Sequence, residues 1–112
     1  MKVAIPTEKD KGLRDKVADI FSRAPTFTII SVVDGEIEDV QVIKNKAADM
    51  RQGAGPLAAR TLKENDVNII LSGDIGPGAR NILETIDIEI GEAEPGQIVK
   101  DVINRLIGSL NS

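Results

Sequence analysis

The sequence contains no cysteine and no histidine among its 112 residues. Disulfides, thiolate nucleophiles, zinc sites and imidazole general bases are therefore excluded. Tryptophan and tyrosine are also absent, and the only aromatic residues are Phe21 and Phe27, so the core must be built from aliphatic side chains. These absences leave backbone groups, hydroxyls, carboxylates, lysines and arginines to carry any function.

The chain also lacks a net positive charge and long apolar runs. The formal net charge is −4, whereas a protein that binds nucleic acid normally presents a basic face. The N-terminal stretch MKVAIP lacks the apolar core of a signal peptide, and no run approaches the roughly 18 apolar residues of a membrane span. We therefore expect a cytoplasmic protein without nucleic-acid or membrane partners.

What is present is a regular alternation of short elements. An apolar run at 3–6 predicts a strand, and the helical spacing of Leu13, Val17, Ile20 and Phe21 predicts a short helix. Two β-rich runs within 26–44, separated by Asp34-Gly35, predict a hairpin. A loop over 45–55 follows, and then a helix from Pro56, a strand over 67–72, a helix over 78–86, a strand over 87–93 and a helix over 94–110.

Helices that alternate with strands after a hairpin predict right-handed crossovers and a partly parallel sheet. We expect one three-layer α/β domain over residues 1–112, with a mixed sheet. The run 36–44 does not alternate strictly, which indicates a bulge or an edge position, and Pro56 suits the first position of its helix. The aliphatic stripe of the last helix predicts core packing, with a dimer contact as the alternative.

Four stretches, in this order, resemble the dinitrogenase iron–molybdenum cofactor biosynthesis family, the domain shared by NifX, NafY and the C-terminal part of NifB. They are MKVAIPTE, DIFSRAPTFTI, GAGPLAAR and LSGDIGPGARNIL, and they extend over nearly the whole chain. Small stand-alone archaeal and thermophilic proteins belong to the same family. The resemblance implies a ribonuclease-H-like fold with a five-stranded mixed sheet flanked by helices. It also implies a role in binding or carrying an iron–sulfur or iron–molybdenum cluster.

The chain departs from the family at one informative position. Family members commonly have His-Phe-Gly-Arg-Ala-Pro where this chain has Ile-Phe-Ser-Arg-Ala-Pro at 20–25, so the histidine is replaced by Ile20. Iron in such clusters prefers thiolate or imidazole donors, and this chain has neither. Oxygen ligands, or non-covalent capture of an anionic cluster, remain. We expect no metal site made of soft ligands.

The turn GDIGPGA predicts an anion site, because Gly76 and Pro77 suit the start of a helix whose free N–H groups point outward. The alternative is a simple strand-to-helix turn with its N–H groups met by water or by Asp74. GAGPLA predicts a second glycine-rich helix start beside the first, and Thr7 and Ser72 lie at strand ends. The candidate anion-binding residues of this shared cleft are Thr7, Arg23, Gly53, Gly55, Ser72, Gly73, Gly76, Gly78 and Arg80.

Two catalytic or cofactor alternatives are weaker. A dinucleotide site needs its glycines directly after a strand, whereas a long loop precedes Gly53. A two-metal hydrolase needs converging acids, for which Glu8, Asp10 and Asp74 are the candidates. The sequence therefore favours a non-catalytic binding or carrier protein for an anionic ligand or cluster, with cluster donor or acceptor proteins as partners, as a monomer or weak dimer. The alternative is a regulatory or interaction domain that lost its cluster.

Overall fold

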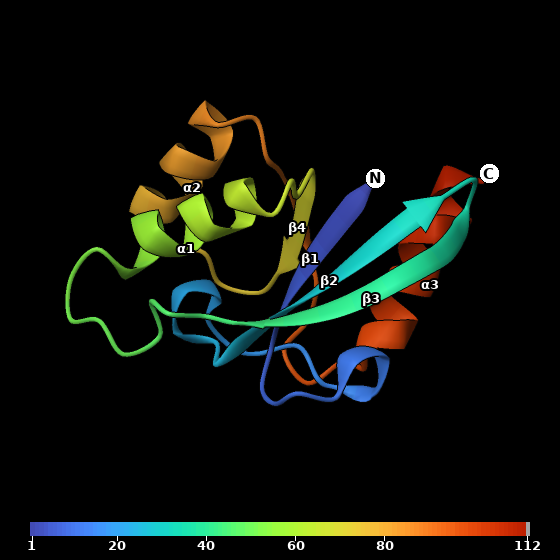
Figure 1. The fold of residues 1–112 in the computed structure, drawn as a ribbon, viewed down its shortest axis with the longest axis horizontal. Coiled ribbons are helices and arrows are strands. Elements are labelled where there is room, and N and C mark those ends of the chain that lie inside the picture. The colour runs from blue at the N-terminus through green and yellow to red at the C-terminus, as the bar shows by residue number, and fades with distance from the viewer. Residues whose placement is uncertain (112) are drawn as a thin grey trace.

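The computed structural model describes residues 1–111 as an α/β fold in which a sheet lies between helices (Figure 1). The strands are β1 (Lys2–Thr7), β2 (Thr26–Val33), β3 (Glu36–Lys44), β4 (Ile69–Ser72) and β5 (Glu89–Glu92). The helices are α1 (Ala54–Glu64), α2 (Pro77–Thr85) and α3 (Val99–Leu110), and two short 3₁₀ turns are η1 (Gly12–Arg14) and η2 (Phe21–Arg23).

The five strands form one mixed sheet in the order β3-β2-β1-β4-β5. β1, β2 and β3 pair antiparallel, whereas β1 with β4 and β4 with β5 pair parallel. The helices α1 and α2 supply the crossovers of the parallel part, as a strand–helix–strand order requires. The predicted fold class, a five-stranded mixed sheet flanked by helices, is confirmed.

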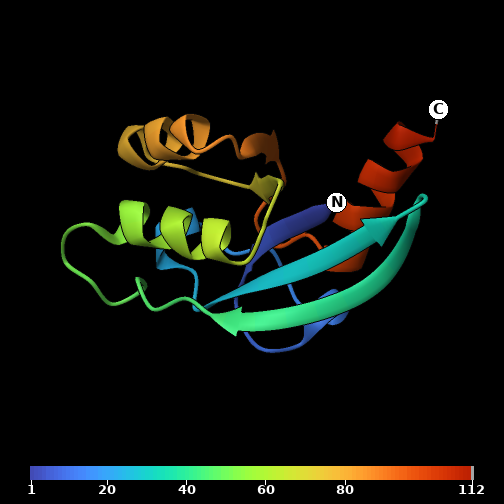
Figure 2. The same cartoon turned by 45° about the horizontal axis from the view of Figure 1, so that its top comes forward.

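The sheet separates two hydrophobic layers (Figure 2). Successive residues of β1 alternate between them, because side chains on a strand point to opposite faces: Val3 and Ile5 pack in the layer under α3, and Ala4 packs in the layer under α1 and α2. The core is aliphatic apart from Phe21 and Phe27, whose ring centroids lie 5.4 Å apart. The predicted aliphatic core is confirmed.

The hairpin between β2 and β3 turns at the predicted dipeptide. Asp34 has φ 52° and Gly35 has φ 76°, the left-handed values that a tight two-residue turn needs. Ser31 pairs with Asp39 but Val32 pairs with Ile37, so β3 contains an extra residue and bulges. β3 is also an edge strand, so both features indicated by its irregular alternation are present.

The short helix expected at 13–21 is wrong. Apart from η1 and η2, this segment is irregular, and Val17 forms a bridge with Thr7 of β1 while Lys16 forms one with Ile98. Val17 and Phe21 are fully buried. The apolar spacing therefore reflects packing of a loop against the sheet.

A buried carboxylate explains why this loop is not helical. Asp15 is 2% exposed, and its side chain accepts backbone N–H groups from Lys9 at 3.1 Å, Lys11 at 3.3 Å and Lys16 at 2.8 Å. Aspartate often satisfies nearby backbone groups in this way, in competition with a helix. The apolar spacing could not reveal this competition.

α1 and α2 begin within two residues of their predicted positions, whereas α3 begins at Val99, five residues later than predicted. α1 starts at Ala54 after Gly53, which has φ 74°, so Pro56 is its third residue and the expected first position is wrong. α2 starts as predicted, with Gly76 before it and Pro77 first. In α3, Val99, Val102 and Ile103 are buried and Leu106 and Ile107 pack against the core, which supports the core interpretation for this part of the stripe, whereas Leu110 is exposed.

Candidate functional site

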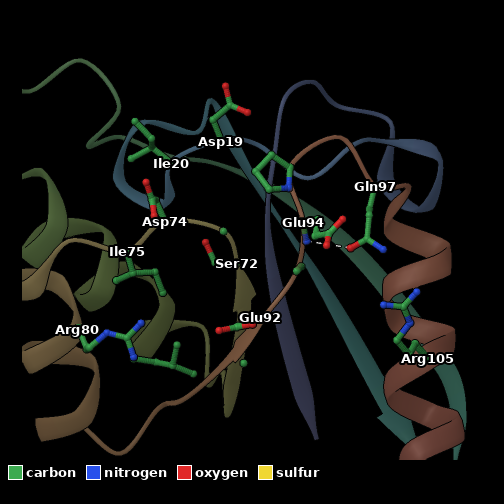
Figure 3. A pocket seen from close by; sticks show the side chains of 15 residues that line it. Asp19, Ile20, Ser72, Asp74, Ile75, Arg80, Glu92, Glu94, Gln97 and Arg105 are labelled. Carbon is green, nitrogen blue, oxygen red and sulfur yellow. Dashed lines mark hydrogen bonds between the residues drawn. The ribbon is translucent and has the colours of Figure 1, made fainter.

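The main cavity lies at the carboxyl ends of β4 and β5 and has a volume of about 830 Å³ (Figure 3). Its walls come from the segment 72–75, from the strand β5 with the connection that follows it, and from one side chain each of α2 and α3, Arg80 and Arg105. The carboxyl ends of parallel strands are the usual place for a ligand in an α/β sheet. The cavity is therefore the first place to look for function.

Ser72 is the last residue of β4 and lines this cavity. It is 2% exposed, and its hydroxyl oxygen has no hydrogen-bond partner within residues 1–111. Its backbone carbonyl, by contrast, accepts the N–H of Ala93 at 3.0 Å. Buried polar atoms without a partner are rare in native proteins, so this hydroxyl marks a position where a ligand group could complete the bonding.

The cavity carries charges of both signs. Arg80 and Arg105 contribute guanidinium groups, and the exposed carboxylates on its walls are those of Asp19, Asp74, Glu92 and Glu94. Apolar side chains lie between them, notably Ile20, Ile75 and Ile90. The cavity can therefore both donate and accept hydrogen bonds around a partly apolar surface. It is not a uniformly positive anion-binding site.

The two glycine-rich helix starts meet, as the sequence predicted. A Cβ placed on Gly55 would lie 2.9 Å from the Cβ of Ala79, so the absence of a side chain there lets α1 and α2 approach closely. Gly76 and Gly78 have no atoms near a Cβ position and are exposed. Gly55 is thus explained by helix packing, whereas Gly76 and Gly78 leave open space at the start of α2.

Thr7 and Arg23 do not line this cavity, although Arg23 lines a smaller one that shares Asp19 and Ile20 with it. The Thr7 hydroxyl is fully buried and shares hydrogen bonds with the hydroxyls of Thr26 at 2.6 Å and Thr28 at 3.0 Å. The Arg23 guanidinium donates to the carbonyls of Ala48 and Met50, which ties down the loop before α1.

Of the nine predicted site residues, Ser72, Gly73 and Arg80 line the same cavity. Gly53, Gly55, Gly76 and Gly78 lie at the two helix starts, and Thr7 and Arg23 make internal hydrogen bonds. Their role as ligands stays a prediction. The sequence did not single out Glu92, Glu94, Gln97 or Arg105, although the turn residues of GEAEPGQ between a strand and a helix were a usable signal.

Two features are absent from the described part of the chain. Among residues 1–111, no group of three or more aspartate or glutamate side chains is placed to hold a metal ion, so Glu8, Asp10 and Asp74 do not form the converging set that a metal-dependent hydrolase needs. No helix in the same residues is long and apolar enough to cross a membrane.

Comparison with known proteins adds the decisive observation. Residues 1–109 match the sequence pattern of the dinitrogenase iron–molybdenum cofactor family. The chain belongs to this family. The resemblance inferred from the four sequence stretches is thereby confirmed over almost the whole chain.

Several known proteins are similar to this chain in sequence and fold. An uncharacterised protein of Methanocaldococcus jannaschii is 28% identical over 98 residues, which cover 88% of this chain and 79% of that protein. The apo form of the orange protein from Desulfovibrio gigas superposes with a TM-score of 0.88 at 25% identity, covering 96% of this chain and 88% of the other. A provisionally assigned NifB protein of Thermotoga gives a TM-score of 0.77 at 28% identity, covering 94% and 85%.

Proposed function

We propose that this family member is a non-catalytic carrier that holds an anionic metal–sulfur cluster, of the iron–sulfur or iron–molybdenum type, as cargo in the cavity beside Ser72. Membership of the iron–molybdenum cofactor family supports the class of cargo. The chain has no cysteine or histidine, so the cluster would be held by hydrogen bonds and contact rather than by soft metal ligands.

The observation that carries this proposal is the unpartnered Ser72 hydroxyl in the wall of a large cavity. A ligand with a hydrogen-bond acceptor there would remove the cost of a buried, unsatisfied donor. The Arg80 guanidinium lines the same cavity and can donate further hydrogen bonds. Sulfides at the surface of a cluster accept such bonds, and hydrogen bonds to sulfur are a common feature of cluster sites.

The surroundings favour a cluster over a small, highly charged anion. The four carboxylates on the cavity walls repel a concentrated negative charge, whereas a cluster spreads its charge over several sulfides. The walls contributed by Ile20, Ile75 and Ile90 suit the weakly hydrated surface of such a body. A volume of about 830 Å³ also lies within the usual range for ligand sites.

Cargo held in this way could be exchanged without breaking metal–protein bonds. A donor protein would deliver the cluster and an acceptor protein would remove it, with only hydrogen bonds and apolar contacts to re-form. This fits a carrier better than an enzyme, since the described residues offer no imidazole or thiolate to move protons or attack a substrate.

Anaerobic loading tests the proposal directly. The purified protein is mixed with tetrathiomolybdate and, separately, with a thiolate-ligated iron–sulfur cluster, and is then passed through a size-exclusion column. We expect a visible chromophore to co-elute with the protein. Ser72→Ala and Arg80→Gln should retain less of it, whereas Arg60→Gln, an exposed change on α1, should retain as much as the parent. A colourless protein fraction at micromolar concentration would exclude the carrier function.

The second candidate is a regulatory or interaction domain that kept the fold without a cluster. The observation that favours it is the open, acidic edge of β5 beside the same cavity. This function predicts a colourless protein that still binds a partner. The loading experiment therefore separates the two candidates.

A further inference from the structure

The outer edge of β5 offers unpaired backbone groups. β5 is the last strand of the sheet, and only its inner edge pairs, with β4. The N–H of Glu89 donates to the carbonyl of Asn68 and that of Ala93 to the carbonyl of Ser72, both at 3.0 Å. Alternate residues of a strand direct these groups to opposite sides, so Ile90 and Glu92 turn their N–H and C=O groups away from the sheet.

A trough runs along this edge. The main cavity and a second one of about 440 Å³ share Arg80 and Ile90, and together they extend along β5 from Asp87 to Pro95. Arg80 comes from α2 on one face of the sheet and Arg105 from α3 on the other (Figure 3). The two helices thus leave the strand edge open between them, with space for a further chain.

The negative charges beside the outer edge of β5 favour a partner strand that is positively charged. Four exposed carboxylates lie on or next to β5, namely Asp87, Glu89, Glu92 and Glu94. Charged residues on an edge strand oppose pairing with a similar edge, and like charges on directly opposite residues of paired strands are destabilising. A basic strand would gain from the same carboxylates.

A second copy of this chain is a poorer source of such a strand. The other edge of the sheet is β3, whose first half carries the exposed acidic residues Glu36, Glu38 and Asp39 and whose second half has Lys44 as its one basic residue. Pairing β5 with another β5 or with the first half of β3 would place carboxylates against carboxylates. A basic segment of a different protein complements the β5 edge better.

We propose that the outer edge of β5 binds an extended, basic segment of another protein, which adds to the sheet as a sixth strand. Its backbone would bond to the outward groups of Ile90 and Glu92, as in other cases of strand addition, and its lysine or arginine side chains would lie beside Glu89 and Glu92. β5 spans four residues, so the added strand is short, about 13 Å at the usual rise per residue. This docking depends on the strand edge and not on any cluster.

Titration with short peptides tests the proposal on the intact protein. The probe is an end-blocked peptide of alternating lysine and valine, added to ¹⁵N-labelled protein and followed by NMR. We expect the largest amide shifts at Ile90 and Glu92, together with slower hydrogen exchange at these two positions. A peptide of alternating glutamate and valine should not bind. Shifts confined to other surfaces, or no shift at millimolar peptide, would overturn the proposal.

Backbone methylation separates strand addition from simple charge attraction. Two versions of the lysine–valine peptide carry N-methyl groups on alternate residues, one on the odd and the other on the even positions. A strand bonds through one edge only, so one version should bind and the other should fail. Equal binding by both methylated versions and the parent would show electrostatic attraction only and would refute strand addition.

Charge reversal on the protein gives the matching control. Glu89→Lys with Glu92→Lys should weaken binding of the lysine–valine peptide about tenfold, because the carboxylate on the same face of the sheet as the lysines is replaced by a like charge, and should allow the glutamate–valine peptide to bind. Glu36→Lys with Glu38→Lys makes the same change on the β3 edge and should leave the affinity unchanged. Equal effects of the two double variants would contradict docking at β5. Retention of a cluster is not needed for any of these results.

Discussion

At the scale of single residues, Ser72 and Thr7 have opposite surroundings although both hydroxyls are buried at the ends of neighbouring parallel strands. Thr7 shares hydrogen bonds with Thr26 and Thr28, whereas the Ser72 hydroxyl has no partner in the described chain. The sequence placed both residues in one ligand cleft, because it shows where strands end but not which hydroxyls find partners. The contrast separates a structural hydroxyl from one that is available to a ligand.

This contrast gives the first prediction at the residue scale. Thr7→Val should lower the free energy of unfolding by about 1–2 kcal/mol, because it removes both hydrogen bonds of the Thr7 hydroxyl and takes away the partner of the buried Thr28 hydroxyl, whereas the Thr26 hydroxyl keeps its bond to the Lys9 carbonyl. Ser72→Ala should leave the free energy of unfolding unchanged or raise it slightly, since no bond is lost. Urea denaturation of both variants measures the difference. A destabilisation by Ser72→Ala as large as that of Thr7→Val would mean that the serine hydroxyl is structurally bonded.

At the scale of elements, the contact between α1 and α2 depends on one glycine. A Cβ on Gly55 would lie 2.9 Å from the Cβ of Ala79, whereas a Cβ on Gly78 would meet nothing within 4 Å. Both residues lie in the first turn of a helix. Their sequence context is therefore alike, and only the packing of the two helices tells them apart.

Replacement of Gly55 and of Gly78 by alanine should change the free energy of unfolding in opposite directions. Gly55→Ala should lower the free energy of unfolding by about 1–3 kcal/mol, because the added methyl group forces α1 and α2 apart. Gly78→Ala should gain about 0.4–1 kcal/mol, because alanine restricts the unfolded chain at a position with a free Cβ direction. Thermal and urea unfolding measure both effects. Stabilisation by Gly55→Ala would show that α1 and α2 do not pack as described.

Elements defined by local chemistry were predictable, and those defined by distant partners were not. Asp34-Gly35 fixes its turn by backbone preference, and Gly76-Pro77 fixes the start of α2 in the same way. The segment around Asp15 was misjudged because its backbone bonds go to a carboxylate and to strands elsewhere in the chain. The cavity was found only in part, since Arg105 reaches it through the packing of α3 against the sheet.

At the scale of the whole molecule, one sheet joins two hydrophobic layers. Leu62 of α1 is fully buried in one layer and Ile103 of α3 in the other. Each strand of the centre contributes side chains to both layers, so loss of one layer exposes the strands that support the second. Single domains of this size usually unfold in one cooperative step.

Truncation in either layer should therefore weaken the entire fold. Leu62→Ala and Ile103→Ala should each lower the free energy of unfolding by about 2–5 kcal/mol, with a single transition in both cases. Circular dichroism and NMR signals from the two layers, followed through one urea titration, should change together. Earlier loss of the α3 signals than of the α1 signals would show that the two layers unfold separately.

The pair formed by Phe21 and Phe27 has a practical consequence. These rings are the only aromatic groups in the chain and lie in contact inside the core. Because indole and phenol groups are missing, the polypeptide is almost transparent in the near ultraviolet. Charge-transfer bands of a bound cluster would therefore be seen there without protein background, and the weak dichroism of the two phenylalanine rings would report the integrity of the core in the cluster-free protein.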